Sequence, residues 1–157
     1  MNNNPEMTHD LLKKAIERHV DETRPLLKQL DDQILHSRPM DEARPLGEVI
    51  LHMLRSLEFY VRGIASNQWE PLRYSLSDCG TAEAVKELAE DVFAKVVDYS
   101  NQISAEDLHR VNDSFNRPAT MAEILLEMIE HSIHHRGQVT VYYRLLNIEP
   151  VRIPYIV

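Results

Sequence analysis

Apolar residues recur at intervals of three and four along four separate stretches of the sequence, at about 8–32, 45–66, 81–103 and 120–146. This spacing places them on one side of an α-helix. The chain has only four glycines, against many residues that favour helices, mainly Leu, Glu, Arg and Ala with some Lys and Met. No stretch shows a convincing period of two, as a strand would. The sequence therefore predicts an all-α protein.

Each predicted helix has one apolar face, which must be buried against another helix. Four such helices predict a four-helix bundle, and 157 residues suit a single domain over residues 1–157. The predicted core positions of the first three helices are Leu11, Leu12, Ala15, Ile16, His19, Val20, Leu26, Leu27 and Leu30, then Leu46, Val49, Ile50, Met53, Leu57, Tyr60 and Ile64, then Val85, Leu88, Ala89, Val92, Phe93, Val96 and Val97.

Several residues mark the predicted helix ends. Pro25 is expected to kink the first helix, and Pro45 to occupy the first position of the second. Thr81 is a predicted N-cap, and Thr120 with Glu123 has the spacing of a capping box. Two connectors of about 15 residues allow a crossover topology as well as a plain up-and-down one. The β-prone tail, 147–157, is expected to pack on the bundle or on a second subunit.

Net charge and cysteine content narrow the range of partners and locations. The net charge is −8 and basic residues are scattered, which disfavours nucleic acid and anionic membrane surfaces and favours small molecules or proteins as partners. The longest apolar stretches are too short to span a membrane. Cys79 is the single cysteine and cannot form an intrachain disulfide, and no signal-peptide pattern opens the chain. We expect a cytoplasmic protein in which Cys79 is an incidental thiol.

The segment HSIHHRGQ, residues 131–138, concentrates three histidines on the fourth predicted helix. Two of them, His131 and His135, are one turn apart, so that both imidazoles can bind one ion. Burying both rings without partners would be costly, and a divalent metal would satisfy them. The predicted inward face of this helix comprises Ile124, Met128, His131, His135, Gln138, Tyr142 and Leu145.

A third metal ligand is expected from another helix. His52 lies at the edge of the apolar face of the second helix, a position that suits a ligand shared between helices, and His19 is the reserve. His134 is rotated away and is interpreted as a supporting, surface or interface histidine. Ser132 stands where the zincin motif has its glutamate, so a zincin-type peptidase is not supported.

Other polar residues have both functional and plain structural interpretations. Gln138 is a candidate for orienting a ligand or substrate, or for an internal hydrogen bond. Glu127, one turn before His131, is a candidate general base or imidazole-orienting carboxylate, or a surface residue. Arg136 and Gly137 are interpreted as a surface charge and a close helix contact. A solvated charged face is expected for Glu48, Arg55, Glu58 and Arg62.

The stretches PLGEVILHMLRSLEFYVRGI and TMAEILLEMIEHSIHHRGQVTVYYRLLNIEP, with H-x-x-x-H-R-G-Q late in the chain and a histidine upstream, resemble the DinB/YfiT-like family of metalloenzymes. This family is distinct from the DNA polymerase of the same name. The resemblance implies an up-down-down-up four-helix bundle, commonly a homodimer. It also implies a nickel, zinc or other divalent ion held by three histidines, which fall on His52, His131 and His135.

The activity implied by the resemblance is a divalent-metal-dependent reaction on a small-molecule substrate. Some family members are similar to S-transferases that use a small thiol, and others to metal-dependent hydrolases. Three neutral imidazoles would leave an ion strongly Lewis acidic with an open position, as either reaction needs. The alternatives are a non-catalytic metal-binding or stress-response bundle, and histidines satisfied by hydrogen bonds without metal.

Overall fold

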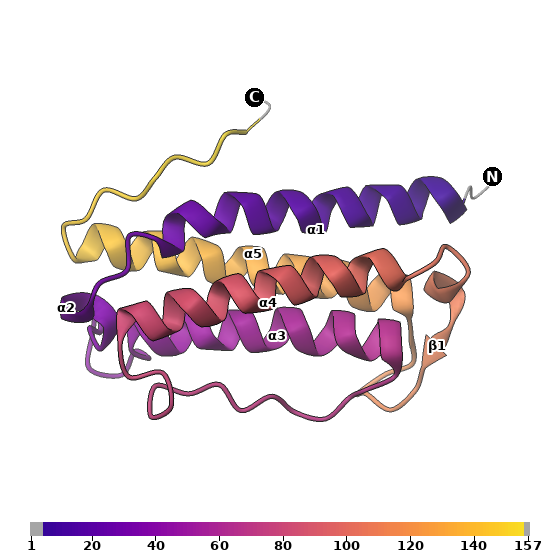
Figure 1. Cartoon of the computed structure of the whole chain (residues 1–157), viewed down its shortest axis with the longest axis horizontal. Coiled ribbons are helices and arrows are strands. Elements are labelled where there is room, and N and C mark those ends of the chain that lie inside the picture. Colours follow the sequence, from indigo (N-terminus) through magenta and orange to yellow (C-terminus); the bar gives the residue numbers. More distant parts are fainter. Residues whose placement is uncertain (1–4, 156–157) are drawn as a thin grey trace.

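Four long helices lie side by side in the computed structural model, which describes residues 5–155 (Figure 1). They are α1 (Pro5–Leu27), α3 (Leu46–Ser66), α4 (Ala82–Gln102) and α5 (Met121–Leu145). Both α1 and α3 contact α4 and α5, so each helix has two long neighbours. The prediction of a mostly helical protein is confirmed.

Shorter elements join the long helices. The short helix α2 (Asp32–Leu35) precedes α3, and the connector 67–80 runs back along the bundle, so that α4 starts at the same end as α3 (Figure 1). Between α4 and α5 lie a 3-10 turn, η1 (Asp107–His109), and two strands, β1 (Val111–Asn112) and β2 (Ala119–Thr120). The strands pair antiparallel, with Val111 opposite Thr120. The sequence did not predict this small hairpin, because strands of two residues carry no measurable period.

The core lies between the four long helices and consists mainly of the predicted apolar side chains. Burying this apolar surface stabilises the bundle. Two residues of the predicted faces are exceptions: Leu11 is 68% exposed and Leu145 is 59% exposed. Both lie toward one end of a helix, where the neighbouring helices no longer cover the whole face.

The predicted caps of α4 and α5 are present. Thr81 accepts a hydrogen bond from the amide of Ala84 at 3.2 Å. Thr120 and Glu123 form the capping box, in which each side chain accepts from the other residue's amide. Pro45 is the N-cap of α3. The prediction that it is the first helical residue is therefore wrong by one position.

The first predicted helix is divided in two, which corrects the expected range of 8–32. Helix α1 ends at Leu27, two residues after Pro25, and Asp31 starts α2 by accepting hydrogen bonds from the amides of Gln33 and Ile34. This N-cap requires extended backbone at Asp31, which a continuous helix excludes. Leu30 is buried in the structure, as it would also be in a continuous helix. The apolar spacing therefore did not reveal the break.

The charged residues of α3 fasten the connector 67–80 to the bundle, so the prediction of a solvated charged face is wrong. Glu58 is 4% exposed and accepts a hydrogen bond from the Tyr74 hydroxyl at 2.6 Å. Arg55 donates to the carbonyl of Tyr74, and Glu48 accepts from the amide of Leu76 at 3.0 Å. The guanidinium of Arg62 donates to the carbonyls of Gln68 and Glu70.

The C-terminal segment packs back on the bundle, one of the two expected arrangements. Gln29 donates to the carbonyl of Glu149 and accepts from the amide of Val151, both at 2.9 Å. The segment is extended but forms no strand within residues 146–155, despite its β-prone composition.

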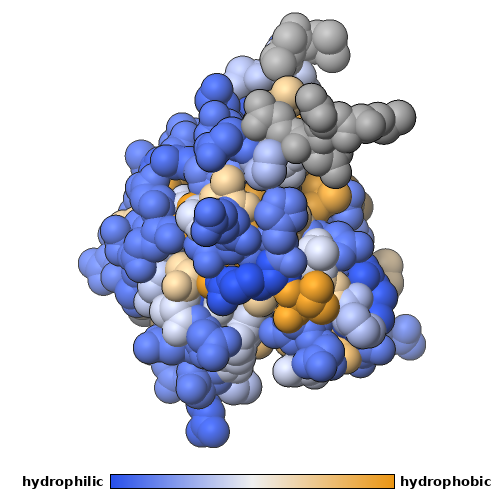
Figure 2. Space-filling model, turned by 90° about the vertical axis from the view of Figure 1, so that its right-hand side faces the viewer, coloured by the Kyte–Doolittle hydropathy of each residue, from blue (hydrophilic) through white to orange (hydrophobic). Residues whose placement is uncertain are grey.

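The end of the bundle near β1 is mainly hydrophilic, with a few separate hydrophobic patches (Figure 2). Within residues 5–155, no helix combines the length and the apolar character that crossing a membrane requires.

Candidate metal centre

Three histidines from two adjacent helices come together inside the bundle. His52 is on α3, and His131 and His135 are on α5. The Nε2 atom of His131 lies 3.3 Å from that of His52 and 3.0 Å from that of His135. Within residues 5–155, this trio is the one group of three or more His, Cys, Asp or Glu residues whose possible ligand atoms all lie within 4.8 Å of one another.

The spacing of these nitrogens matches one shared ion. With metal–nitrogen bonds of about 2.0–2.1 Å, two ligands at tetrahedral or right angles are separated by roughly 2.9–3.4 Å. The two observed Nε2 separations, 3.0 and 3.3 Å, fall in that range. Three nitrogen lone pairs this close repel one another unless a cation or protons lie between them. The three histidines can therefore bind one metal ion.

A hydrogen bond fixes the tautomer of His135. Its Nδ1 lies 2.6 Å from Oε1 of Gln138, and an amide oxygen only accepts, so Nδ1 carries the proton. Nε2 of His135 then keeps its lone pair free for the ion, which is how metal-binding imidazoles are usually oriented. Gln138 thus makes an internal hydrogen bond, to His135 on its own helix. Its role toward a substrate stays a prediction.

At Nδ1, fewer hydrogen bonds orient the ring of His131 than that of His135. Its Nδ1 is buried and has no hydrogen-bond partner among residues 5–155. If Nε2 of His131 binds an ion, Nδ1 carries the proton and remains an unpaired donor. Packing in α5, and not a hydrogen bond, therefore orients this ring.

All three histidines are kept neutral by their surroundings. Burial, together with the neighbouring histidines and the cations Arg44 and Arg55, lowers the pKa of His52 to about 4. Burial is also the main cause that lowers the pKa values of His131 and His135. The hydrogen bond to Gln138 partly opposes this shift at His135. Neutral imidazole is the form that binds metal, so the donor set fits a divalent ion.

Two cavities border the trio. One, of about 700 Å³, includes His131, Tyr60, Phe115 and Met128 in its lining. The other, of about 410 Å³, includes His52, His135 and Arg44. Because each cavity contains at least one of the histidines, a molecule in either one can approach the point where the Nε2 atoms converge.

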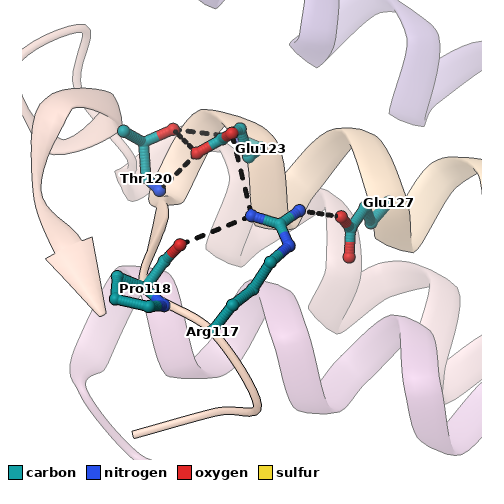
Figure 3. Close-up of polar contacts among 5 residues, drawn as sticks. All are labelled: Arg117, Pro118, Thr120, Glu123 and Glu127. Atoms are coloured by element: carbon teal, nitrogen blue, oxygen red, sulfur yellow. Dashed lines mark hydrogen bonds and ion pairs between the residues drawn. The ribbon is translucent and has the colours of Figure 1, made fainter. Parts of the chain in front are cut away.

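Glu127 lines the larger cavity with His131, but its carboxylate is paired with Arg117 (Figure 3). Arg117 comes from the loop between β1 and β2 and lies between Glu123 and Glu127. This ion pair ties the loop to α5 at the cavity's edge. Sequence reasoning missed Arg117, because nothing in a six-residue loop shows which way its side chains point.

His19, the reserve ligand, is engaged elsewhere. Arg136 donates to its Nδ1 at 3.2 Å, so the ring proton is on Nε2, which donates to Ser132 Oγ at 2.6 Å. Arg136 also pairs with Glu22 at 2.6 Å. This group joins α1 to α5, and Arg136 is 4% exposed, so its interpretation as a surface charge is wrong.

The other residues of the histidine segment lie outside the trio. His134 is exposed, and its ring stacks edge-on against His135 at 5.1 Å. A Cβ atom added to Gly137 would meet nothing within 4 Å, so the expected close helix contact is absent within residues 5–155. Cys79 is half-buried in the connector 67–80, and burial raises the pKa of its thiol, which favours the unreactive form.

Comparison with known proteins places these features in a family. The sequence matches the DinB family over residues 1–156. The chain belongs to the DinB family. A curated DinB-like relative, the uncharacterised protein YjoA of Bacillus subtilis, is 26% identical over 129 residues, which cover 80% of this chain and 82% of YjoA.

Solved structures share the DinB fold. The crystal structure of YjoA has a TM-score of 0.76 at 22% identity, over 92% of this chain and 96% of that one. A DinB-like protein from Bacillus cereus has a TM-score of 0.68 at 23% identity, over 88% and 91% of the two chains. At these identities, the likeness to both crystal structures concerns the fold alone.

Proposed function

We propose that this DinB-family protein is a divalent-metal-dependent enzyme that holds one nickel or zinc ion with Nε2 of His52, His131 and His135. The observation that carries the proposal is the convergence of these three nitrogens, at 3.0 and 3.3 Å, beside two cavities. Three protein ligands are typical of catalytic sites, which keep a position open for substrate.

The reaction that we favour is transfer of a small thiol to a small electrophilic molecule. When bound, the ion would lower the pKa of the thiol. The thiol releases its proton to solvent water and its sulfur forms a bond to the electrophilic carbon. The bond between that carbon and the leaving group breaks, and the leaving group departs with the bonding electrons. Such a reaction needs room for two reactants, and the cavities of about 700 and 410 Å³, each lined by at least one of the three histidines, offer it.

Hydrolysis is the weaker alternative. It needs a general base within hydrogen-bond reach of the attacking water. Glu127 is the acidic residue of the larger cavity, and Arg117 already holds its carboxylate. A purely structural metal is also disfavoured, since residues 5–155 offer no fourth Cys, His, Asp or Glu in the group.

A metal analysis tests the proposal. Protein purified without a histidine tag should contain about one divalent ion per chain, measured by elemental analysis. His52→Ala and His135→Ala should each lose it, whereas His134→Ala, in the same segment but outside the trio, should keep it. Absence of metal from the wild type, with no uptake of added nickel, zinc or manganese, would overturn the proposal.

The assembly and location belong to the same proposal. The up-down-down-up order is supported by the return of the connector 67–80 along the bundle in Figure 1. A homodimer through α5 is supported by exposed apolar side chains that share one face with Gly137: Leu126, Ile133 and Val141. Light scattering on the wild type and on Ile133→Glu tests it. The single cysteine supports a cytoplasmic location.

A further inference from the structure

We propose that Arg44 binds the carboxylate end of a small anionic ligand in the cavity beside His52 and His135. The proposal deepens the proposed function and rests on it, since the other end of the ligand would reach the metal. It names a class of substrate: small molecules with a carboxylate at one end and a metal-binding group at the other.

Arg44 lies in the same cavity lining as two of the three histidines. Arg44 lines the cavity of about 410 Å³ together with His52, His135, Gln138 and Tyr142. Its backbone is held from two sides, because the Tyr142 hydroxyl donates to its carbonyl at 2.8 Å and Pro45 follows it as the N-cap of α3. The base of this arginine is thus fixed relative to both helices that carry the histidines.

Arg44 also brings a positive charge to this cavity. Arg44 has no ion pair or side-chain hydrogen bond within residues 5–155, and none of the residues that line its cavity is acidic. Its guanidinium charge lies in the same cavity lining as His52, His135 and Tyr142. The cavity therefore presents a cation without a counter-charge.

The larger cavity differs in this respect. Its arginine, Arg117, is paired with Glu127 and approaches Glu123 at 3.8 Å. An anionic group could pair with Arg117 only by displacing the carboxylate of Glu127 or Glu123. The less polar part of a ligand would suit that side, where Tyr60, Phe115 and Met128 contribute to the lining. Of the two cavities, the one lined by Arg44 therefore suits the carboxylate end of a ligand.

The ligand chemistry follows from the guanidinium. Its planar pair of N–H donors matches the two oxygens of a carboxylate, and such charge-assisted hydrogen bonds are among the stronger ones. Loss of one in a partly exposed site weakens binding by about tenfold. A dicarboxylate of suitable length can place one carboxylate on the ion and the other on Arg44. A monocarboxylate can reach only one of them.

Calorimetric titration of the zinc-loaded protein tests the proposal. Malonate, succinate and glutarate are compared with propionate, at fixed ionic strength, for the wild type, Arg44→Gln and Arg44→Lys. Arg73→Gln is the control, because Arg73 is an exposed arginine of the connector 67–80 outside the cavity lining. Metal content is measured first in every variant.

The expected result is that at least one dicarboxylate binds the wild type about tenfold more tightly than propionate does. Arg44→Gln should abolish this advantage, Arg44→Lys should retain part of it, and Arg73→Gln should leave it unchanged. Equal dicarboxylate affinity in the wild type and Arg44→Gln, with zinc bound to both, would overturn the role of Arg44 and leave the metal site intact.

If the wild type binds no zinc, the proposed function fails separately. The metal-free protein is then titrated with the same dicarboxylates and followed by NMR of the arginine side-chain N–H groups. The Arg44 signal is assigned by its absence from the spectrum of Arg44→Gln. Saturable shifts of this signal that a dicarboxylate causes and propionate does not, and that Arg73→Gln leaves unchanged, would support an anion site. No shift of that signal would overturn it.

Discussion

Oε1 of Gln138 accepts a hydrogen bond from Nδ1 of His135 at 2.6 Å, three residues earlier on α5. Gln138→Leu removes the acceptor that fixes the ring and its tautomer. Loss of such a supporting hydrogen bond typically weakens metal binding by about 10- to 100-fold, and we expect zinc affinity to fall by at least the lower figure. Competition with a chelating dye measures it. The exposed Gln102→Leu serves as control, and an unchanged affinity in Gln138→Leu would contradict the orienting role.

The buried His19 predicts that stability falls as the solution becomes acidic. Burial and the nearby Arg136 lower its pKa from 6.5 to about 3 in the folded protein. Between these two values, the unfolded chain binds a proton that the folded chain does not. The stabilising difference is therefore complete above pH 6.5 and is lost as the pH falls, by up to about 1.4 kcal/mol per unit.

A variant isolates this contribution. His19→Gln keeps a donor and an acceptor for Ser132 and Arg136 but cannot titrate. Urea unfolding at pH 7, 6 and 5, with a chelator present to remove metal effects, should show a steeper loss in the wild type than in His19→Gln. Parallel pH profiles would show that His19 is not the titrating group.

Tyr74→Phe is expected to destabilise the protein by about 1–3 kcal/mol, because the buried Glu58 would lose its hydroxyl donor. Lys95, whose Nζ lies 3.8 Å from Glu58, would compensate only in part. Chemical denaturation measures the change. Tyr155→Phe, an exposed tyrosine of the tail, should change the free energy of unfolding by less than 0.5 kcal/mol, roughly the range of surface substitutions.

Gly137→Ala is expected to stabilise the chain by about 0.5–1 kcal/mol, since Gly137 lies within α5 and an added Cβ would meet no atom within 4 Å. Gly63→Ala should do the opposite, because a Cβ there would lie 2.2 Å from the Trp69 ring. Thermal unfolding compares the two variants. This stabilisation is expected for the single chain, whereas destabilisation of Gly137→Ala that grows with protein concentration would support the proposed dimer contact at this face of α5.

Metal removal should leave the bundle folded. The core is continuous across the four long helices and does not depend on an ion. A metal that binds the folded chain stabilises it by about 2.7 kcal/mol at a free concentration 100 times its dissociation constant. We therefore expect a chelator to lower the melting temperature while helical circular dichroism at 25 °C is retained. Complete unfolding on chelation would favour a structural metal.

The sequence predicted the long helices and much of the core because burial repeats with the helical period. The same reasoning placed His131 and His135 on one face, and the structure brings them together with His52. The break between α1 and α2 was missed, since Asp31 gives a cap signal that the apolar repeat conceals. At this position the N-cap hydrogen bonds of Asp31, and not the apolar period, determine where the helix begins.

The charged residues were harder to predict. Arg136 and Glu58 were interpreted as exposed because an isolated charge is rarely buried. Each is buried because a partner distant in sequence satisfies it: Glu22 for Arg136 and Tyr74 for Glu58. Ser132 and Arg136, one turn apart and both facing His19, are a signal that could have revealed the first of these contacts. Arg44 was missed because connectors have no period from which a side-chain direction can be derived.

The ligands of the candidate metal centre are distributed unevenly along the chain, since His52 and His131 are 79 positions apart. The whole of α4 folds within that interval, yet it contributes none of the three ligands. The site therefore assembles only when α3 docks on α5, a late, long-range event compared with the formation of single helices. In a refolding experiment, the moment at which the chain first captures zinc would time that docking step.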